Sequence, residues 1–222
     1  DADRQNEAPI IQVMGDQNKK QAAKISAEIA KLEMEMKSAN KPDLKAFAKW
    51  EADLKPKASR WHVLMPSKMT ASSGAKLKAD SDGSILVSGK TAETDDYTIT
   101  AKNKLKKITG IKIEALAYDK LTSGGPGRSG NFVLNEIELS SGKNKASFSN
   151  ASSTYDQNKF EAASAIDGDS GNDSGWAVGG SLGKDHHIVL ELDKPLEAKD
   201  LNLKMLQRYP NHALGRFRVL VT

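Results

Sequence analysis

From residue 61 onward the chain is a succession of short apolar runs separated by glycine-rich turns. Several runs alternate with a period of two, as where Tyr97 and Ile99 flank Thr98, which is typical of strands with one buried face. Asp82-Gly83 and Gly179-Gly180 are typical turn sequences between such runs. The candidate strands are Trp61–Met65, Ala75–Lys78, Ser84–Ser88, Tyr97–Ala101, Thr109–Ala117, Phe132–Leu139, Lys145–Ser149, Ile188–Leu192, Leu201–Leu206 and Phe217–Val221. Ten short strands without helices between them predict a mainly β fold, a β-sandwich or jelly roll, over residues 59–222.

Residues 17–58 differ from the rest because their apolar residues recur at helical spacing. The first seam, at intervals of four, three and four, consists of Ile25, Ile29, Leu32 and Met36. Pro42 breaks this helix, because proline suits only the first turn of a helix. A second helix follows, with helical spacing at Leu44, Phe47, Trp50 or Glu51, and Leu54. We expect a tether over residues 1–16, and then an α-helical hairpin over residues 17–58 whose apolar stripe packs on the sandwich or on a neighbouring domain.

Charge and cysteine content exclude several classes of function. The 222 residues include 33 Lys and Arg against 29 Asp and Glu, a net charge of +4. This mild basicity permits an acidic partner such as a sulfated or uronic glycan, whereas the lack of a dense basic cluster with interleaved aromatic residues argues against nucleic acid. A chain without cysteine has no disulfides, zinc–thiolate sites, iron–sulfur clusters or thiol catalysis. No run of about 18 apolar residues is present, so we expect no membrane span.

The stretch from Ala162 to Trp176 enters an Asp-Gly turn, continues through a polar loop and ends on a tryptophan. Together with the strand segments at 151–153, 190–192, 201–205 and 216–219, it resembles the N-terminal half of a discoidin-type, galactose-binding-like β-sandwich. The acidic strand Asn135–Leu139 resembles the last strand of that family, yet it precedes the Asp-Gly loop here. The resemblance therefore implies a circular permutation, in which spatial neighbours are kept while the chain order changes. Such sandwiches usually bind glycans or cell-surface ligands and rarely perform chemistry.

A second resemblance covers almost the entire chain. The matching segments are Ala27–Glu33, Trp50-Glu51, Trp61–Pro66, Asp82–Leu86, Gly125–Arg128, Asn131–Glu136 and Leu214–Arg218. They are similar to an insert in large exported proteins of planctomycetes and their relatives, which carry paired domains of unknown function and often a haem-binding cytochrome segment. This resemblance implies export to the periplasm, cell surface or medium, and a setting related to polysaccharides. The start Asp1-Ala2 also leads us to expect an excised or processed part of a longer protein.

The polar loop of the sandwich resemblance is a candidate calcium site. Calcium requires six to eight oxygen ligands. In related sandwiches these oxygens come from the loop after Asp-Gly and from a glutamate of the final strand, which carries over to Asp169, Asn172, Ser174 and Glu136. The alternative is that Asp167-Gly168 forms a simple turn with Asx hydrogen bonds. The structural cofactor implied by the resemblance is therefore Ca²⁺.

Several side chains are candidates for binding a glycan. Trp176 could stack on a sugar ring or fill the core, and Tyr155, Tyr209 and Trp61 carry the same two alternatives. His186 could donate to a sugar hydroxyl or be a core histidine. Arginine beside histidine and aromatic residues suits hydroxyl-rich or anionic sugars, but it also suits a loop held by local salt bridges. These alternatives apply to Arg208, Tyr209, His212 and Arg216.

The sequence offers little support for catalysis. The glycine-rich run from Gly124 to Gly130 lacks the Gly-Lys-Ser/Thr of a phosphate-binding loop, and we expect no helix after it. Glu136 and Glu138 share one strand face but have no partner motif of a glycosidase. We therefore expect a non-catalytic carbohydrate-binding module of a larger exported protein, which binds polysaccharide through loops at one end of the sandwich. The alternative is a structural or protein-interaction insert, whose helical hairpin docks onto neighbouring domains.

Overall fold

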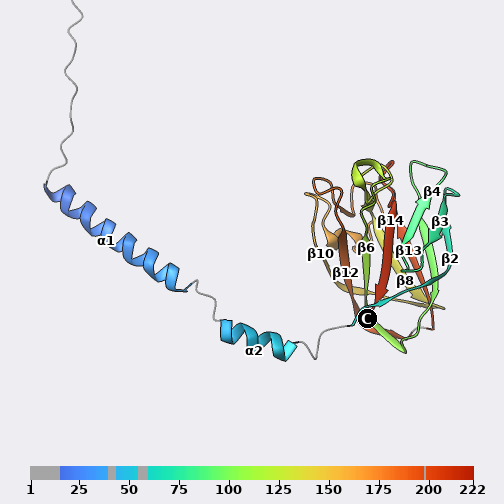
Figure 1. Cartoon of the computed structure of the whole chain (residues 1–222), viewed down its shortest axis with the longest axis horizontal. Coiled ribbons are helices and arrows are strands. Elements are labelled where there is room, and N and C mark those ends of the chain that lie inside the picture. Colours follow the sequence, from blue (N-terminus) through green and yellow to red (C-terminus); the bar gives the residue numbers. More distant parts are fainter. Residues whose placement is uncertain (1–15, 40–43, 55–59, 198) are drawn as a thin grey trace, which may run out of the picture. The chain divides into compact units, whose positions relative to one another are not determined.

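The computed structural model describes residues 16–39, 44–54, 60–197 and 199–222 (Figure 1). The chain divides into two compact units, residues 1–58 and residues 59–222. The first unit contains two helices, α1 (Asp16–Ala39) and α2 (Leu44–Leu54), which confirms the two predicted helical segments. Except for Asp16, the predicted tether lies outside the described residues. The hairpin arrangement of the helices and their docking onto the sandwich stay predictions.

The second unit consists mainly of two antiparallel sheets that pack as a sandwich, which confirms the predicted mainly β class. The seven-stranded sheet has the order β10 (Phe148–Ser153), β12 (His186–Glu197), β6 (Lys107–Ala115), β14 (Arg216–Val221), β4 (Ile85–Ser88) and β3 (Lys76–Ala79), with β1 (His62–Val63) also on β14. The five-stranded sheet has the order β2 (Pro66–Ala71), β5 (Tyr97–Lys102), β13 (Asp200–Leu206), β8 (Glu136–Ser141) and β9 (Asn144–Lys145). A separate pair joins β11 (Trp176–Ala177) to β7 (Val133–Leu134). Two short 3₁₀ helices, η2 (Thr122–Gly124) and η3 (Ala162–Ala165), lie within loops.

The core lies between the two sheets and follows the period-two pattern of the strands. In β5 the inward-facing residues Tyr97, Ile99 and Ala101 are buried while the residues between them are partly exposed. The ring of Tyr97 stacks on Phe217 of the opposite sheet, with centroids 5.9 Å apart and an interplanar angle of 12°. The Tyr97 hydroxyl donates to the carbonyl of Leu214 at 2.9 Å, so this buried polar group has its partner.

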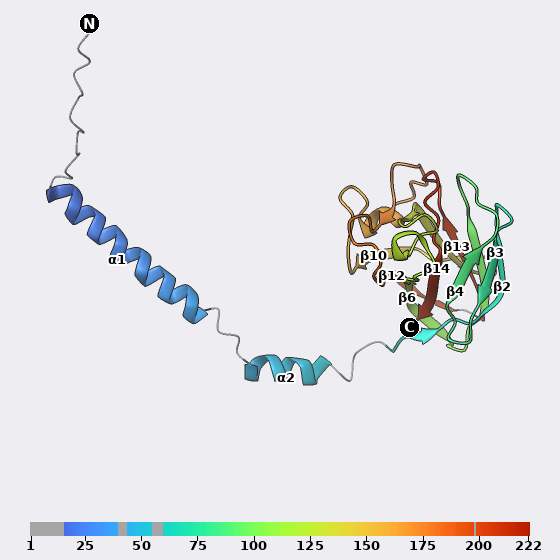
Figure 2. The ribbon, with the colours of Figure 1, turned by 45° about the horizontal axis from the view of Figure 1, so that its top comes forward.

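Strand register determines which loops meet at one end of the sandwich. Ala115, at the end of β6, pairs with His186 at the start of β12 and lies beside Phe217 near the start of β14. In the other sheet, Met205 near the end of β13 pairs with Tyr97 at the start of β5. The segments that extend beyond these positions therefore share one end of the sandwich, at the top of Figure 2. This loop end consists of residues 72–75, 89–96, 116–132, 154–185 and 207–215.

Candidate functional site

The predicted ligand-binding residues lie on loops or strand starts at the loop end. Tyr155 and Trp176 belong to the segment between β10 and β12, and His186 begins β12. Arg208 and Tyr209 follow β13 directly. His212 and Arg216 lie in the same loop and at the start of β14, respectively. Their environments differ, and only some of them remain available to a ligand.

Trp176 is a core residue. Its side chain is 0% exposed, and its ring packs edge-on against Phe132 with centroids 5.0 Å apart. The indole Nε1 donates to the carbonyl of Tyr155 at 3.0 Å, which satisfies its one polar group. The prediction that this ring stacks on a sugar is therefore wrong, and the alternative, that it fills the core, is confirmed.

Tyr155 and His186 are also committed to internal contacts. The Tyr155 hydroxyl donates to the carbonyl of Gly179 at 3.1 Å, and its ring lies 5.7 Å from the His186 ring. His186 is 6% exposed, and its Nε2 lies 2.6 Å from the carbonyl of Ser181. A carbonyl oxygen can only accept, so Nε2 is the donor of the ring. These two side chains hold residues 179–181, before β12, in place, and their polar atoms are used in these contacts.

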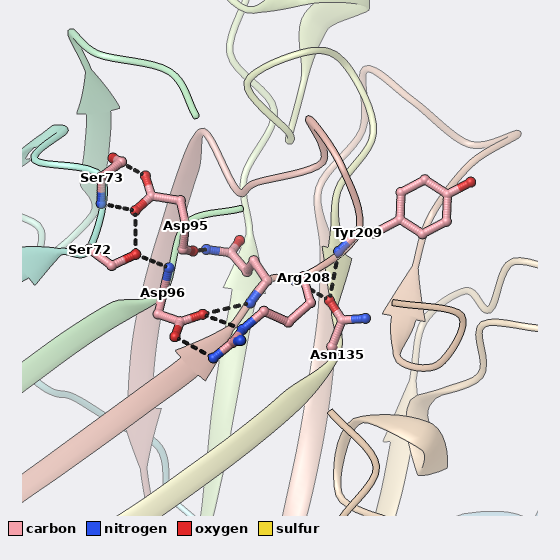
Figure 3. Close-up of polar contacts among 8 residues, drawn as sticks. Ser72, Ser73, Asp95, Asp96, Asn135, Arg208 and Tyr209 are labelled. Carbon is pink, nitrogen blue, oxygen red and sulfur yellow. Dashed lines mark hydrogen bonds and ion pairs between the residues drawn. The ribbon is translucent and has the colours of Figure 1, made fainter. Parts of the chain in front are cut away.

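Arg208 is held by an ion pair (Figure 3). Its Nη2 lies 2.9 Å from Oδ2 of Asp96, and its Nε donates to Oδ1 of the same carboxylate at 3.1 Å. Adjacent Asp95 is 1% exposed and accepts hydrogen bonds from the N–H and the hydroxyl of Ser73, at 3.0 Å and 2.7 Å. The guanidinium is thus used in a bidentate contact that links residues 89–96 to residues 207–215. For Arg208 this geometry favours the salt-bridged loop over direct sugar recognition.

Arg216 is engaged on the outer face of the seven-stranded sheet. Its guanidinium lies 5.4 Å from the ring centroid of Tyr118, within the range of a cation–π contact. Its Nη2 donates to the hydroxyl of Ser84 at 3.2 Å. The neighbouring Arg218 is likewise occupied, since its Nε donates to Glu114 at 2.8 Å. This arginine row stabilises the sheet surface, and it does not converge with Tyr209 and His212.

Asn135 joins the two loops in which most of the candidate residues lie. Its side chain is 0% exposed, and its Nδ2 donates to the carbonyls of Gly171 and Ser174 at 2.7 Å and 2.6 Å. Its Oδ1 accepts from the backbone N–H of Arg208 at 2.6 Å and of Tyr209 at 3.3 Å. One buried amide thereby fixes the position of two loops, and Figure 3 shows its contacts with Arg208 and Tyr209. The sequence showed only a strand at this position, and a polar residue within an apolar run was the one available signal.

The close approach of the polar loop to Asn135 requires a glycine. Gly175 adopts a φ of +131°, a conformation that side chains rarely allow. A Cβ at this position would lie 2.7 Å from Cα of Asn135, closer than real contacts permit. Gly175 therefore lets the chain pass against β7 and brings Trp176 into the core.

Three rings form an aromatic platform, defined here as Phe160, Tyr209 and His212. The Tyr209 ring is edge-on to Phe160, with centroids 5.8 Å apart, and edge-on to His212, with centroids 4.7 Å apart. All three residues are partly exposed, and the Tyr209 side chain points away from the polar network in Figure 3. Nδ1 of His212 lies 2.7 Å from the carbonyl of Pro210 and so donates, which leaves Nε2 as the acceptor of the neutral ring. Phe160 is a member that the sequence interpretation missed.

The candidate calcium loop is organised by its own turns. The Asp169 N–H donates to Asp167 Oδ1, and the Gly171 N–H donates to Asp169 Oδ1, each at 2.8 Å. These are Asx hydrogen bonds, and each of them uses one oxygen of its carboxylate. Ser174 Oγ lies 3.5 Å from Asp167 Oδ2, and Asn172 is exposed.

Glu136 lies beside this loop, as the resemblance implied. Its Oε2 accepts the N–H of Gly168 at 3.1 Å, next to a hollow of about 420 Å³. Within the described ranges, however, no group of three or more His, Cys, Asp or Glu side chains could hold a metal ion. The contact of Glu136 with the loop is thus present, while calcium binding stays a prediction.

Glu136 should make stability depend on pH. Burial raises the pKa of Glu136 to about 7 from 4.5, with Asp167, Glu138 and Asp169 adding repulsion and the N–H of Gly168 opposing it. The unfolded chain therefore releases this proton first, so the group's contribution to stability falls as pH rises from about 4.5 to about 7. Glu136→Gln keeps an acceptor for Gly168 and should unfold at a higher temperature than the parent at pH 8, with the difference disappearing at pH 4. Thermal unfolding followed by circular dichroism across this range provides the measurement.

Glu191→Gln is the matched control for this titration, because Glu191 is exposed on β12 and lies outside the loop. It should change the melting temperature little at either pH. A Glu136→Gln effect of the same size at pH 4 and pH 8 would contradict the assignment of the pH dependence to this carboxyl.

Comparisons with known proteins place no family name on this arrangement. The chain matches no known family model, and no curated protein sequence is significantly similar to it. Among the described helices, neither is sufficiently long and apolar to cross a membrane.

Proposed function

We propose that the sandwich is a non-catalytic carbohydrate-binding module of a larger exported protein, and that it binds polysaccharide at the aromatic platform. The observation that carries this proposal is the partly exposed Tyr209 ring, held edge-on between Phe160 and His212 on an immobilised loop. Aromatic rings can pack on the apolar face of a sugar, and Nε2 of His212 can accept a hydrogen bond from a sugar hydroxyl. A non-catalytic role is consistent with the engagement of three loop-end carboxylates, those of Asp95, Asp96 and Asp169, in hydrogen bonds or ion pairs.

The same proposal includes the finer fold type, a permuted galactose-binding-like jelly roll. It is supported by the contact between Glu136, on the strand that resembles the family's last, and Gly168 of the Asp-Gly loop. These segments would be neighbours in the unpermuted fold as well. The proposal thus explains why an acidic strand that comes early in the chain contacts a loop that comes later.

A glycan array that includes neutral, uronic and sulfated polysaccharides tests the proposed function. Saturable binding of neutral polysaccharides should fall at least about tenfold in Tyr209→Ala, because an aromatic ring is among the larger contributors to a binding interface. Tyr209→Phe should retain most of the binding, since the ring is kept. Unchanged unfolding of both variants would show that the loop itself is intact. No saturable binding of any neutral polysaccharide, or equal binding of neutral polysaccharides by Tyr209→Ala and the parent, would contradict the proposal.

A second candidate is a structural or protein-interaction insert that docks through its helices. The observation that favours it is the exposure of apolar side chains on α1 and α2, among them Ile25 at 52%, Leu32 at 53% and Trp50 at 57%. Apolar side chains at helical spacing are normally buried against a partner. If the array showed no glycan binding, docking through these helices would become the favoured function.

A further inference from the structure

Three turns meet at the end of the sandwich opposite the loop end. Residues of the β5–β6, β8–β9 and β12–β13 connections line a single hollow of about 660 Å³. The N–H of Asn103 donates to the carbonyl of Lys199 at 2.8 Å, which joins the first turn to the third. Within the first turn, Nδ2 of Asn103 donates to the carbonyl of Leu105 at 2.8 Å, and Oδ1 accepts the N–H of Leu105 at 3.1 Å. These contacts form a backbone frame for the first and third turns.

The side chains carried by this frame are strongly basic. In residues 102–107, 141–145 and 197–200, seven lysines face two carboxylates, those of Glu197 and Asp200. These segments therefore have a net charge of +5, against +4 for the entire chain, so positive charge is concentrated at this end. All seven lysines are exposed. The name lysine end is used for Lys102, Lys104, Lys106, Lys107, Lys143, Lys145 and Lys199.

Most of this charge is not neutralised within the described part of the chain. Lys107 forms an ion pair with Glu197 at 3.3 Å, with side chains that are 60% and 76% exposed. The other six lysines make no ion pair in the residues that the structure describes. Like charges held close together on these turns repel one another, and an anionic polymer that lies across them relieves that repulsion.

We propose that the lysine end binds an anionic polysaccharide, one bearing sulfate or carboxylate groups, as a site separate from the aromatic platform. The three turns contain neither arginine nor any aromatic residue. They therefore lack two features typical of nucleic-acid binding: a planar guanidinium that donates two hydrogen bonds to one phosphate, and aromatic rings on which nucleobases stack. A lysine ammonium is a point charge that can donate hydrogen bonds to sulfate or carboxylate groups in many directions, which suits a flexible acidic glycan.

The test uses the full chain with dextran sulfate, polygalacturonate and neutral dextran as probes. The variant Lys104→Gln/Lys106→Gln/Lys143→Gln removes three charges from the lysine end. Its matched control, Lys78→Gln/Lys120→Gln/Lys184→Gln, removes three exposed charges elsewhere, so the net charge is equal in the two proteins. The lysine-end variant should bind the acidic polymers at least about tenfold more weakly, and the control should stay within about twofold of the parent. The affinity of the parent should fall with added salt, and that dependence should be shallower in the lysine-end variant.

Three outcomes would overturn the proposal. The first is an equal loss of affinity in both variants, which would trace binding to net charge alone. The second is no saturable binding of either acidic polymer. The third is tighter binding of duplex DNA than of either polysaccharide at the same salt concentration. The lysine-end variant should bind the neutral polysaccharides of the glycan array as the parent does, whereas Tyr209→Ala should bind them more weakly, so failure of this proposal and failure of the aromatic platform are separate results.

Discussion

Replacing Trp176 with alanine should destabilise the sandwich by about 4 kcal/mol, the cost typical of truncating a buried tryptophan. The ring is 0% exposed, packs against Phe132 and donates its only N–H to the carbonyl of Tyr155 at 3.0 Å. Truncation therefore removes apolar contacts, opens a cavity and leaves a backbone carbonyl without its donor. Urea unfolding followed by fluorescence and circular dichroism gives the free energy of unfolding directly.

Trp176→Phe separates the two contributions to this loss. It keeps an aromatic ring against Phe132 but lacks the N–H, so its loss should be about half that of the alanine variant. If Trp176→Ala kept the parent's unfolding free energy and lost only glycan binding, the ring would belong to a binding surface and its assignment to the core would be wrong.

Asn135→Ala should cost about 3 kcal/mol of unfolding free energy. The carbonyls of Gly171 and Ser174 lose their donor, and the N–H groups of Arg208 and Tyr209 lose their acceptor. The loop that carries Tyr209 should then loosen. Amide hydrogen exchange should accelerate across residues 167–175 and 207–212, while the strands β6 and β12 exchange as in the parent.

Asn135→Asp tests whether both ends of the amide matter. Aspartate retains an acceptor for Arg208 and Tyr209 but turns a second oxygen toward the carbonyls of Gly171 and Ser174. It should therefore be no more stable than the alanine variant at pH 7. Full stability of Asn135→Asp would mean that the two carbonyls do not need the donor, which would contradict the joining role of this side chain.

The mainly β class of the fold could be predicted from the sequence, because the alternation of apolar and polar residues along a strand is a local property. The segment Tyr97–Ala101 matches β5 closely, since every second residue there is apolar and buried. The interpretation of Phe132–Leu139 as one strand was less accurate, because the chain forms β7 and β8 on either side of Asn135. The strand β2 was missed because its sequence, Pro66–Ala71, is largely polar and half-exposed. Its place in the sheet comes from pairing with β5, which no local pattern reveals.

The candidate site depends on contacts between distant residues, which a single sequence does not contain. The Arg208 side chain pairs with Asp96 across 112 positions, and its backbone N–H donates to Oδ1 of Asn135 across 73. The arginine beside a tyrosine and a histidine was visible, but the carboxylate that occupies its guanidinium was not. In the same way, Asp-Gly followed by a tryptophan is compatible with either an exposed ring or a buried one. The choice between them came from Phe132 and Tyr155, neither of which is adjacent to Trp176 in sequence.

The fixed backbone of residues 207–209 has a consequence for the thermodynamics of binding. Asn135 and Asp96 anchor this segment from outside, and Gln207, which is 1% exposed, bonds to the carbonyl of Asp95 and the N–H of Leu214 at 2.7 Å and 2.6 Å. A loop that is already ordered before a ligand arrives loses little conformational entropy when the ligand binds. A shallow platform of this kind can therefore hold one polysaccharide segment with modest contact area, while affinity for a long polymer grows through repeated attachment along the chain rather than through closure of the loop.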